Sequence, residues 1–326
     1  MRFFLMVLAA CLAVDRSQGV PHAVNYTTHW NGENYLRLAD WGAGQGLELR
    51  WLKRDETIQL SNGSSRLLLR VDSREAQWDG VAVWLSFPVL MRNGSLFLSR
   101  IDAETAIQPL ISHPRSRAGV EIKRICLDPG HGGKDPGYCV GPNQEKKYTL
   151  LLAEELRRQL TGSGFKVTLT RTTDRFVELP ERPELANRRN ADLFLSIHFN
   201  ATEIGRASVQ GAQVFCLTPA GASSTNTRGE GGGAGWFTGN RNNDKNLFLA
   251  YAVQKQLIHS GGVEDRGIRR ARFAVLRDAA MPAVLIEAGF MSHPVEGRKI
   301  FSAGYRHQLA QAIADGIKAY KKTAER

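Results

Sequence analysis

The stretch Ile122-Lys123-Arg124-Ile125-Cys126-Leu127 leads into Asp128-Pro129-Gly130-His131-Gly132-Gly133, and these residues decide the fold of the second part of the chain. The first six residues form a short, largely apolar run typical of a buried strand, and the glycines after it allow a tight turn. A helix is expected over about residues 144–160, where apolar residues recur at helical spacing before Gly162-Ser163-Gly164. A strand, a turn and a helix in this order predict the first unit of an α/β domain.

The same alternation continues to the C-terminus. Strands are expected at residues 165–170, 192–199, 211–217, 273–276 and 283–288, and helices at 185–190, 246–259 and 305–322. We therefore expect an α/β domain over residues 121–326, with a central mixed, mostly parallel sheet flanked by helices.

The first part of the chain has strand-like patterning from about residue 25 to residue 111. Apolar runs at 47–51, 66–71 and 81–85 are separated by turn signals such as Asn62-Gly63 and Asp79-Gly80. This pattern predicts a small β-rich accessory domain over residues 20–112, joined by a polar linker over 113–120. Its tryptophans form either part of a core or a sugar-stacking face; they are Trp30, Trp41, Trp51, Trp78 and Trp84.

The N-terminus resembles a secretory signal. Arg2 is followed by an apolar run over residues 3–14 that is too short to span a bilayer, so residues 1–19 are expected to be a signal peptide. Leu8-Ala9-Ala10-Cys11 also resembles a lipoprotein box, and a membrane association is expected only if Cys11 is lipidated. Removal of the signal leaves three cysteines without paired spacing, which excludes a disulfide framework.

The charge of the chain indicates an anionic partner. Its formal net charge is +11, which favours attraction to a polyanion. Because the export signal directs the chain out of the cytoplasm, an anionic cell envelope is a better candidate than nucleic acid, and no nucleic-acid partner is expected. A basic surface that serves only solubility is the alternative.

Four side chains carry the predicted chemistry: His131, Glu145, His198 and Glu287. Each lies at the end of a predicted strand or the start of a predicted helix. Because His and Glu rarely lie in apolar strands without a polar partner, core packing does not explain the set, although any one of them alone could be a capping group or a core histidine. His131, Glu145 and His198 form a complete ligand set for one catalytic zinc ion with an open fourth position, and Glu287 remains available as a base.

A long segment over residues 219–245 interrupts the alternation. It is rich in Gly, Ser, Thr and Asn, and a connection of this length without secondary structure is usually functional or disordered. We expect a mobile loop beside the site or an insertion without function.

The motifs around the four residues resemble a known family. Residues 127–133, Glu145 at the start of a helix, residues 191–201 and residues 284–290 are similar to the zinc-dependent N-acetylmuramoyl-L-alanine amidases of the amidase-3 family. The resemblance implies a zinc-hydrolase-like fold with His131, Glu145 and His198 as zinc ligands and Glu287 as the catalytic glutamate. Residues 78–101 loosely resemble the N-terminal-like domains of copper amine oxidases.

The resemblance also implies a substrate and a location. Such enzymes cut the amide between N-acetylmuramic acid and L-alanine in peptidoglycan, for cell-wall turnover or daughter-cell separation, and they are exported to the periplasm or cell envelope. An activator protein is a further possible partner. Two alternatives remain open from the residues: a zinc carboxypeptidase or aminopeptidase on a similar sheet, and a peptidoglycan-binding protein without activity.

Overall fold

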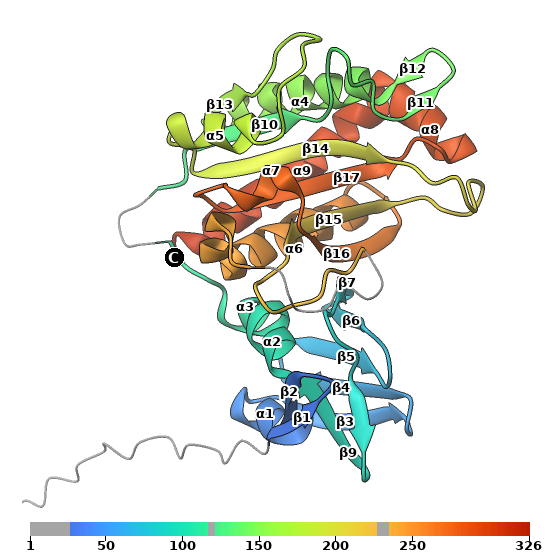
Figure 1. The fold of residues 1–326 in the computed structure, drawn as a ribbon, viewed down its shortest axis with the longest axis vertical. Coiled ribbons are helices and arrows are strands. Elements are labelled where there is room, and N and C mark those ends of the chain that lie inside the picture. Colours follow the sequence, from blue (N-terminus) through green and yellow to red (C-terminus); the bar gives the residue numbers. More distant parts are fainter. Residues whose placement is uncertain (1–26, 117–120, 227–234) are drawn as a thin grey trace, which may run out of the picture.

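The protein is described here by a computed structural model that covers residues 27–116, 121–226 and 235–326 (Figure 1). The second part of the chain contains six adjacent strands of one large sheet. In spatial order they are β13 (Lys166–Leu169), β10 (Arg124–Pro129), β14 (Leu193–Asn200), β17 (Ala283–Phe290), β15 (Ala212–Leu217) and β16 (Asp265–Ala271). All neighbouring pairs are parallel except β15 and β17, which are antiparallel. The expected mixed, mostly parallel sheet is confirmed.

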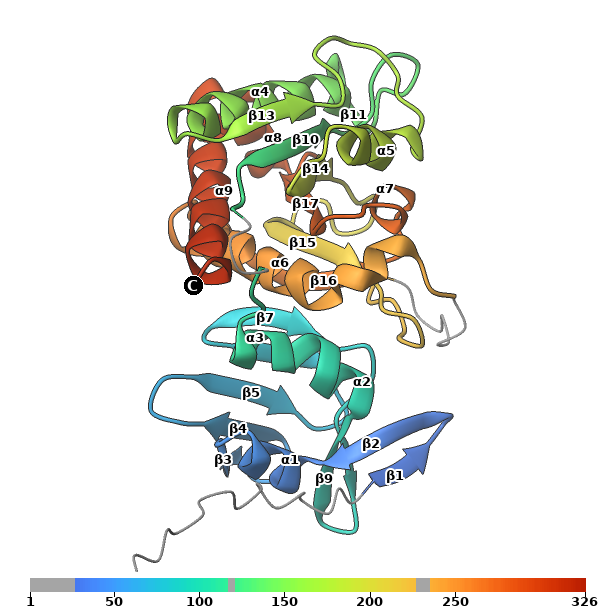
Figure 2. The ribbon, with the colours of Figure 1, turned by 90° about the vertical axis from the view of Figure 1, so that its left-hand side faces the viewer.

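Helices cover both faces of this sheet (Figure 2). One face packs against α4 (Glu145–Gly162), α6 (Asn243–His259), α8 (Pro294–Phe301) and α9 (Ala303–Ala324) in a single apolar cluster. The other face packs against α5 (Glu181–Arg188) and α7 (Ala274–Arg277) in a second, smaller cluster. A 3-10 turn over Thr238–Asn242 leads into α6. The alternation of apolar residues along the strands thus gives each face its own helical layer.

The first part of the chain is rich in strands, as expected. One sheet has the order β1 (Thr27–Trp30), β2 (Glu33–Arg37), β9 (Ser95–Ser99) and β8 (Leu90–Arg92). A separate antiparallel meander contains β3 (Glu48–Lys53), β4 (Thr57–Ser61), β5 (Arg66–Arg70), β6 (Glu75–Trp78) and β7 (Val81–Trp84). A short pair, β11 (Cys139–Val140) and β12 (Asn143–Gln144), lies before α4 in the second part.

The first part of the chain also contains helices that the sequence analysis did not predict. They are α1 (Leu38–Gly44), α2 (Arg100–Asp102), a π-helical segment (Ala103–Ile107) and α3 (Gln108–Ser112). Ser99 starts this helical run, because its hydroxyl accepts a hydrogen bond from the Asp102 amide at 3.1 Å. Ala103, Ala106, Ile107 and Leu110 then bury one face of it in the core.

The two parts share one continuous sheet. β7 pairs in parallel with β16 through Val83 and Ile268, so the meander extends the large sheet to eleven strands. An ion pair also joins the parts, because Arg270 Nη1 of β16 lies 3.4 Å from Asp102 Oδ1 and both side chains are at most 2% exposed. The accessory region is therefore attached to the α/β region by backbone pairing and by a buried charge pair.

Two expectations near the end of the sheet differ from the structure. Residues 273–276 were expected as a strand, but residues 274–276 lie in helix α7 and Phe273 is its N-cap, since a short apolar run does not distinguish strand from helix. Strand β16 was not expected because arginines at 266, 269 and 270 interrupt its apolar pattern. The other strands and helices expected after residue 121 are present with ends shifted by a few residues.

Other expectations concern the ends of the chain. The signal peptide at residues 1–19 and the lipidation of Cys11 lie outside the described residues. In the part that the structure describes, no helix combines the length and apolar character needed to cross a bilayer. Cys126, Cys139 and Cys216 are free, as expected.

Candidate active site

The four sequence-selected residues meet at one edge of the sheet. His131 follows β10, His198 lies near the end of β14, and Glu287 lies directly beside His198 in the register of β14 with β17. Glu145 is the first residue of α4. Parallel strands end at the same edge, where loops from several strands form ligand sites. All four residues line one cavity of about 320 Å3.

His131, Glu145 and His198 converge on a single point. His131 Nε2 lies 3.0 Å from Glu145 Oε1, and His198 Nδ1 lies 3.1 Å from the same oxygen. One ligand atom from each residue lies within 4.8 Å of the other two. Two imidazoles and a carboxylate at these separations can hold one metal ion with a position left for water.

Two glycines allow His131, Glu145 and His198 to approach one another closely. A Cβ at Gly130 would lie 2.2 Å from the ring of His198, and a Cβ at Gly137 would lie 2.7 Å from Glu145 and His131. His131 itself has a positive φ of 61°, which turns the chain sharply after β10. The local sequence therefore creates the space in which the imidazoles and the carboxylate meet.

The charges of the cluster depend on one another. Burial favours the neutral acid at Glu145, but ion pairing with His131 and His198 outweighs it, and the pKa of Glu145 is lowered. Burial disfavours protonation of His131, but the carboxylates of Glu145 and Asp135 outweigh it and raise its pKa. Glu145 is also held by the amides of Tyr138 at 3.0 Å and Phe199 at 3.1 Å. The site therefore keeps the carboxylate of Glu145 ionised although it is buried, and a buried negative charge favours the binding of a cation.

Asp135 supports the cluster, and the sequence analysis did not identify it. Its Oδ2 lies 2.8 Å from His131 Nδ1, while its Oδ1 accepts the Gly137 amide at 3.0 Å. This contact directs Nε2 of His131 toward Glu145 and His198, as a carboxylate behind a metal-binding histidine does. Its position four residues after His131 was a usable signal.

Asp128 stabilises the loop that carries His131. It is fully buried and accepts hydrogen bonds from Thr170, Ser196 and Arg182 at 2.6, 2.8 and 3.1 Å. Arg182 also donates to the carbonyl oxygen of His131 at 3.1 Å. Asp128 therefore acts on the backbone of the His131 loop and makes no contact with an imidazole.

The N-terminus of α4 has no side-chain cap among the described residues. The N-cap is Gln144, whose side chain makes no capping hydrogen bond, and the Oδ1 of Asn143 instead accepts a hydrogen bond from the Tyr148 hydroxyl. Glu145 therefore gains its position from the backbone amides and the two histidines rather than from an Asn143 cap.

Glu287 lies in the same cavity, and one of its two carboxyl oxygens has no hydrogen-bond partner among the described residues. Its Oε2 is buried and forms no hydrogen bond with any residue that the structure describes. Burial, and then the negative charge of Glu145, raise the pKa of Glu287 well above its usual range. A carboxyl group with this environment is a candidate for proton transfer.

The remaining wall of the cavity is mainly apolar. It is formed by residues of α7 and its surroundings, together with Leu179, which is 47% exposed at the mouth. The sequence analysis missed this wall because it assigned residues 273–276 to a strand. The remaining lining residues are Tyr138, Leu179, Phe199, Asn200, Ala201, Phe273, Ala274, Val275 and Leu285.

Comparison with known proteins identifies the family. The model of the family "N-acetylmuramoyl-L-alanine amidase" matches residues 125–319. The chain is 36% identical over 227 residues to N-acetylmuramoyl-L-alanine amidase AmiC of Neisseria meningitidis, which covers 61% of this chain and 53% of that protein. The match thus spans about half of that relative.

Solved structures agree with this. The amidase AmiC2 of Nostoc punctiforme is 32% identical with a TM-score of 0.52, over 63% of this chain and 99% of that one. The CwlD amidase of Clostridioides difficile, solved in complex with the GerS lipoprotein, is 28% identical with a TM-score of 0.50, over 61% of this chain and 98% of that one. The arrangement of the site and these similarities lead to one conclusion: the chain belongs to the N-acetylmuramoyl-L-alanine amidase family of hydrolases.

Proposed function

We propose that the protein hydrolyses the amide between the lactyl group of N-acetylmuramic acid and L-alanine in peptidoglycan, during cell-wall turnover or daughter-cell separation. The observation that carries the proposal is the meeting of three side chains able to ligate a metal with the carboxyl of Glu287, whose buried Oε2 lacks a partner among the described residues, in one cavity. Membership of the amidase family supports the choice of bond.

The donor set fits one zinc ion held by His131, Glu145 and His198. Imidazole nitrogen and carboxylate oxygen are donors that zinc accepts, and a catalytic site has three protein ligands. The buried negative charge of Glu145, which two histidines and two backbone amides stabilise, also suits a cation. When bound, zinc supplies Lewis-acid polarisation of the amide carbonyl and lowers the pKa of water to about 7.

Glu287 moves the proton. Its free Oε2 accepts a proton from the attacking water and then delivers it to the nitrogen of the departing L-alanine. An amine is a poor leaving group without this proton. The raised pKa of Glu287 suits the second step, because the protonated form persists at higher pH than in an ordinary glutamate.

The other parts of the chain have proposed roles. Residues 1–19 act as a signal peptide that directs the protein to the periplasm or cell envelope, with a lipid anchor only if Cys11 is modified. Residues 20–112 form an accessory domain that anchors or spaces the enzyme, residues 113–120 a linker, and residues 121–326 the catalytic domain. An activator protein is a possible partner, since the similar CwlD amidase was solved in complex with a lipoprotein.

Mass spectrometry of digested peptidoglycan tests the function. We expect whole stem peptides with a free L-alanine amino group, together with glycan strands that have lost their peptides. A carboxypeptidase or aminopeptidase would release single amino acids, and a binding protein without activity would release nothing, so either result would contradict the proposal.

A further inference from the structure

A second cavity lies between β6, β7 and β16, where the accessory region joins the catalytic sheet. Figure 1 shows the position of these three strands. It has a volume of about 280 Å3 and contains two arginines, Arg266 and Arg269, beside an indole ring. No residue that lines it also lines the cavity of Glu287. The residues are Glu75, Ala76, Gln77, Ala82, Val83, Trp84, Asp265, Arg266 and Arg269.

This cavity and the active site lie on the same face of the sheet. Leu285 of β17 pairs with Phe215 of β15, and Phe215 pairs with Arg269 of β16. Residues that are directly opposite in register share a face, and so do residues two apart in one strand. Arg269 therefore faces the same side as Leu285 and Glu287. The guanidinium of Arg269 lies 4.3 Å over the ring of Trp84, which extends this face onto β7.

The two guanidinium groups have unused donors. Arg266 donates one hydrogen bond, 3.5 Å long, to the Gln210 carbonyl, and its Nε is buried without a partner among the described residues. Arg269 donates to two carbonyls at 3.3 and 3.5 Å. Neither forms an ion pair within the described ranges 27–116, 121–226 and 235–326. Five N–H donors per arginine are thus met by only one or two long contacts.

The acids in the lining have other partners. Glu75 pairs with Arg70 at 3.2 Å. Asp265 accepts hydrogen bonds from the amide of Ala82 at 2.8 Å, the amide of Gly267 at 2.8 Å and the Gln254 side chain at 2.7 Å. Burial, and then the positive charges of Arg266 and Arg74, lower the pKa of Arg269 to about 10, while the negative charge of Glu75 opposes this shift. Among the described residues neither Glu75 nor Asp265 forms an ion pair with Arg266 or Arg269, so an anion placed between the two guanidinium groups would gain their unmatched N–H donors and reduce their mutual repulsion.

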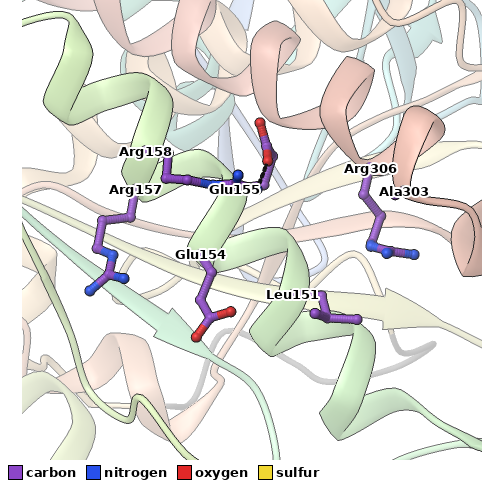
Figure 3. A pocket seen from close by; sticks show the side chains of 7 residues that line it. All are labelled: Leu151, Glu154, Glu155, Arg157, Arg158, Ala303 and Arg306. Atoms are coloured by element: carbon purple, nitrogen blue, oxygen red, sulfur yellow. Dashed lines mark hydrogen bonds and ion pairs between the residues drawn. The ribbon is translucent and has the colours of Figure 1, made fainter.

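The hollow between α4 and α9 provides a contrast (Figure 3). It is of similar size, about 350 Å3, and also carries arginines. Two of its three arginines have partners, because Arg158 pairs with Glu155 and Arg306 donates to the Ile300 carbonyl at 2.7 Å, whereas Arg157 forms no ion pair among the described residues. The hollow also differs in position, since α4 and α9 cover the face of the sheet that is opposite to α7.

We propose that the cavity around Arg266 and Arg269 binds a carboxylate on the peptide portion of the wall substrate while the amide bond lies in the active site. Planar guanidinium groups match carboxylates in geometry as well as in charge. The inference rests on the proposed function, since the carboxylate bound here belongs to the stem peptide of the same peptidoglycan substrate.

The spacing of the sheet is compatible with one stem peptide. β7 is three strands away from β17, which corresponds to about 14 Å at about 4.8 Å per strand. An extended peptide spans about 3.3–3.6 Å per residue, so about four residues cover this distance. The carboxylate that fits is therefore one near the C-terminal end of the stem peptide. The accessory region then contributes to substrate recognition through Trp84 of β7.

The test uses the full chain and two soluble muropeptides, one with free peptide carboxylates and one with the same carboxylates converted to amides. We expect the unmodified protein to prefer the acid form through a KM lower by at least about tenfold, with similar kcat, because charge-assisted hydrogen bonds are lost in the amide. Arg266→Gln and Arg269→Gln reduce this preference toward unity, while Arg269→Lys retains part of it. Arg158→Gln is the matched control and leaves it unchanged.

A second readout does not depend on turnover. Isothermal titration of the full chain with a synthetic stem tetrapeptide, and with its all-amide form, measures binding at the cavity directly. We expect the acid form to bind more tightly, and Arg266→Gln to remove the difference. An equal preference in the unmodified protein and in both glutamine variants overturns the inference. If the tetrapeptide binds as expected but no muropeptide is cleaved, the carboxylate site stands and the proposed activity fails.

Discussion

The environment of Glu287 ties its role to a single unpaired atom. A buried carboxylate oxygen without a hydrogen-bond donor is costly to the folded protein, and Oε2 of Glu287 is such an atom among the described residues. The proximity of Glu145 adds repulsion and raises the pKa further. This cost to folding stability is consistent with an oxygen that exchanges a proton with water and substrate. Glu287 therefore has a different role from the three metal-ligand residues.

Replacing Glu287 tests that role. Glu287→Gln keeps the shape of the side chain but removes its ability to carry a proton. We expect kcat to fall by about 100-fold or more, with zinc still bound at one ion per chain by metal analysis. Glu104→Gln, at a glutamate that is 61% exposed on the accessory region, is the control. Near-normal turnover of Glu287→Gln would remove this residue from the proton transfer.

Asp135 positions a ligand, and its replacement has a different signature. Asp135→Asn weakens the contact with His131 Nδ1, so we expect zinc affinity to fall by about 10- to 100-fold, measured by competition with a chelating dye. Activity returns at saturating zinc, which a loss of folding would not allow. Asp278→Asn, at an exposed aspartate, serves as the control. Unchanged zinc affinity in Asp135→Asn contradicts the positioning role.

Buried charges link the elements around the site. Arg182 of α5 and Asp128 of β10 form an ion pair at 3.1 Å, with side chains that are 1% and 0% exposed. Arg182 also donates to the carbonyls of Val177 and Pro129 at 3.1 Å each. One helix and one strand are thereby fixed on either side of the His131 loop.

Breaking this pair should destabilise the protein strongly. Arg182→Met leaves Asp128 buried without its cation, which costs about 3–5 kcal/mol. Arg188→Met, on the same helix, breaks the exposed pair with Glu184 and should cost at most about 1 kcal/mol. Urea unfolding measures both. Equal costs for the two variants would show that the buried pair has no special contribution.

At this scale the sequence predicts regular elements and misses irregular ones. β10, α4, β14 and β17 have clear apolar periodicity, so the four chemical residues could be placed at strand and helix ends. β16 was not predicted because both faces of this strand carry an arginine, which interrupts its apolar pattern. Arg269 faces a cavity, and Arg270 pairs with the buried Asp102. The wall from α7 depends on how loops fold in space, which no local pattern encodes, whereas Asp135 lies four residues after His131 and could have been found from that spacing.

One sheet runs through the whole molecule and joins its two parts. Eleven strands run from β13 to β3, and the Arg270–Asp102 pair is buried at the junction. The sequence did not predict this shared sheet, because pairing between distant strands such as β7 and β16 has no local signal.

This continuity predicts cooperative unfolding. Separating the regions would expose Ile268 and leave both charges of the pair without a partner, so we expect the full chain to melt in one calorimetric transition. Arg270→Met should lower the melting temperature of the whole transition. Two well-separated transitions in the unmodified chain would contradict the structural coupling of the two regions.

Turnover of the metal-free protein tests the central claim most directly. The full chain is stripped with a chelator, the metal content is verified, and the release of stem peptides from purified peptidoglycan is followed while zinc is added back. We expect no release without metal, and activity that rises with zinc and reaches a plateau at one ion per chain, as binding by His131, Glu145 and His198 requires. Full activity of the verified metal-free protein would contradict the account.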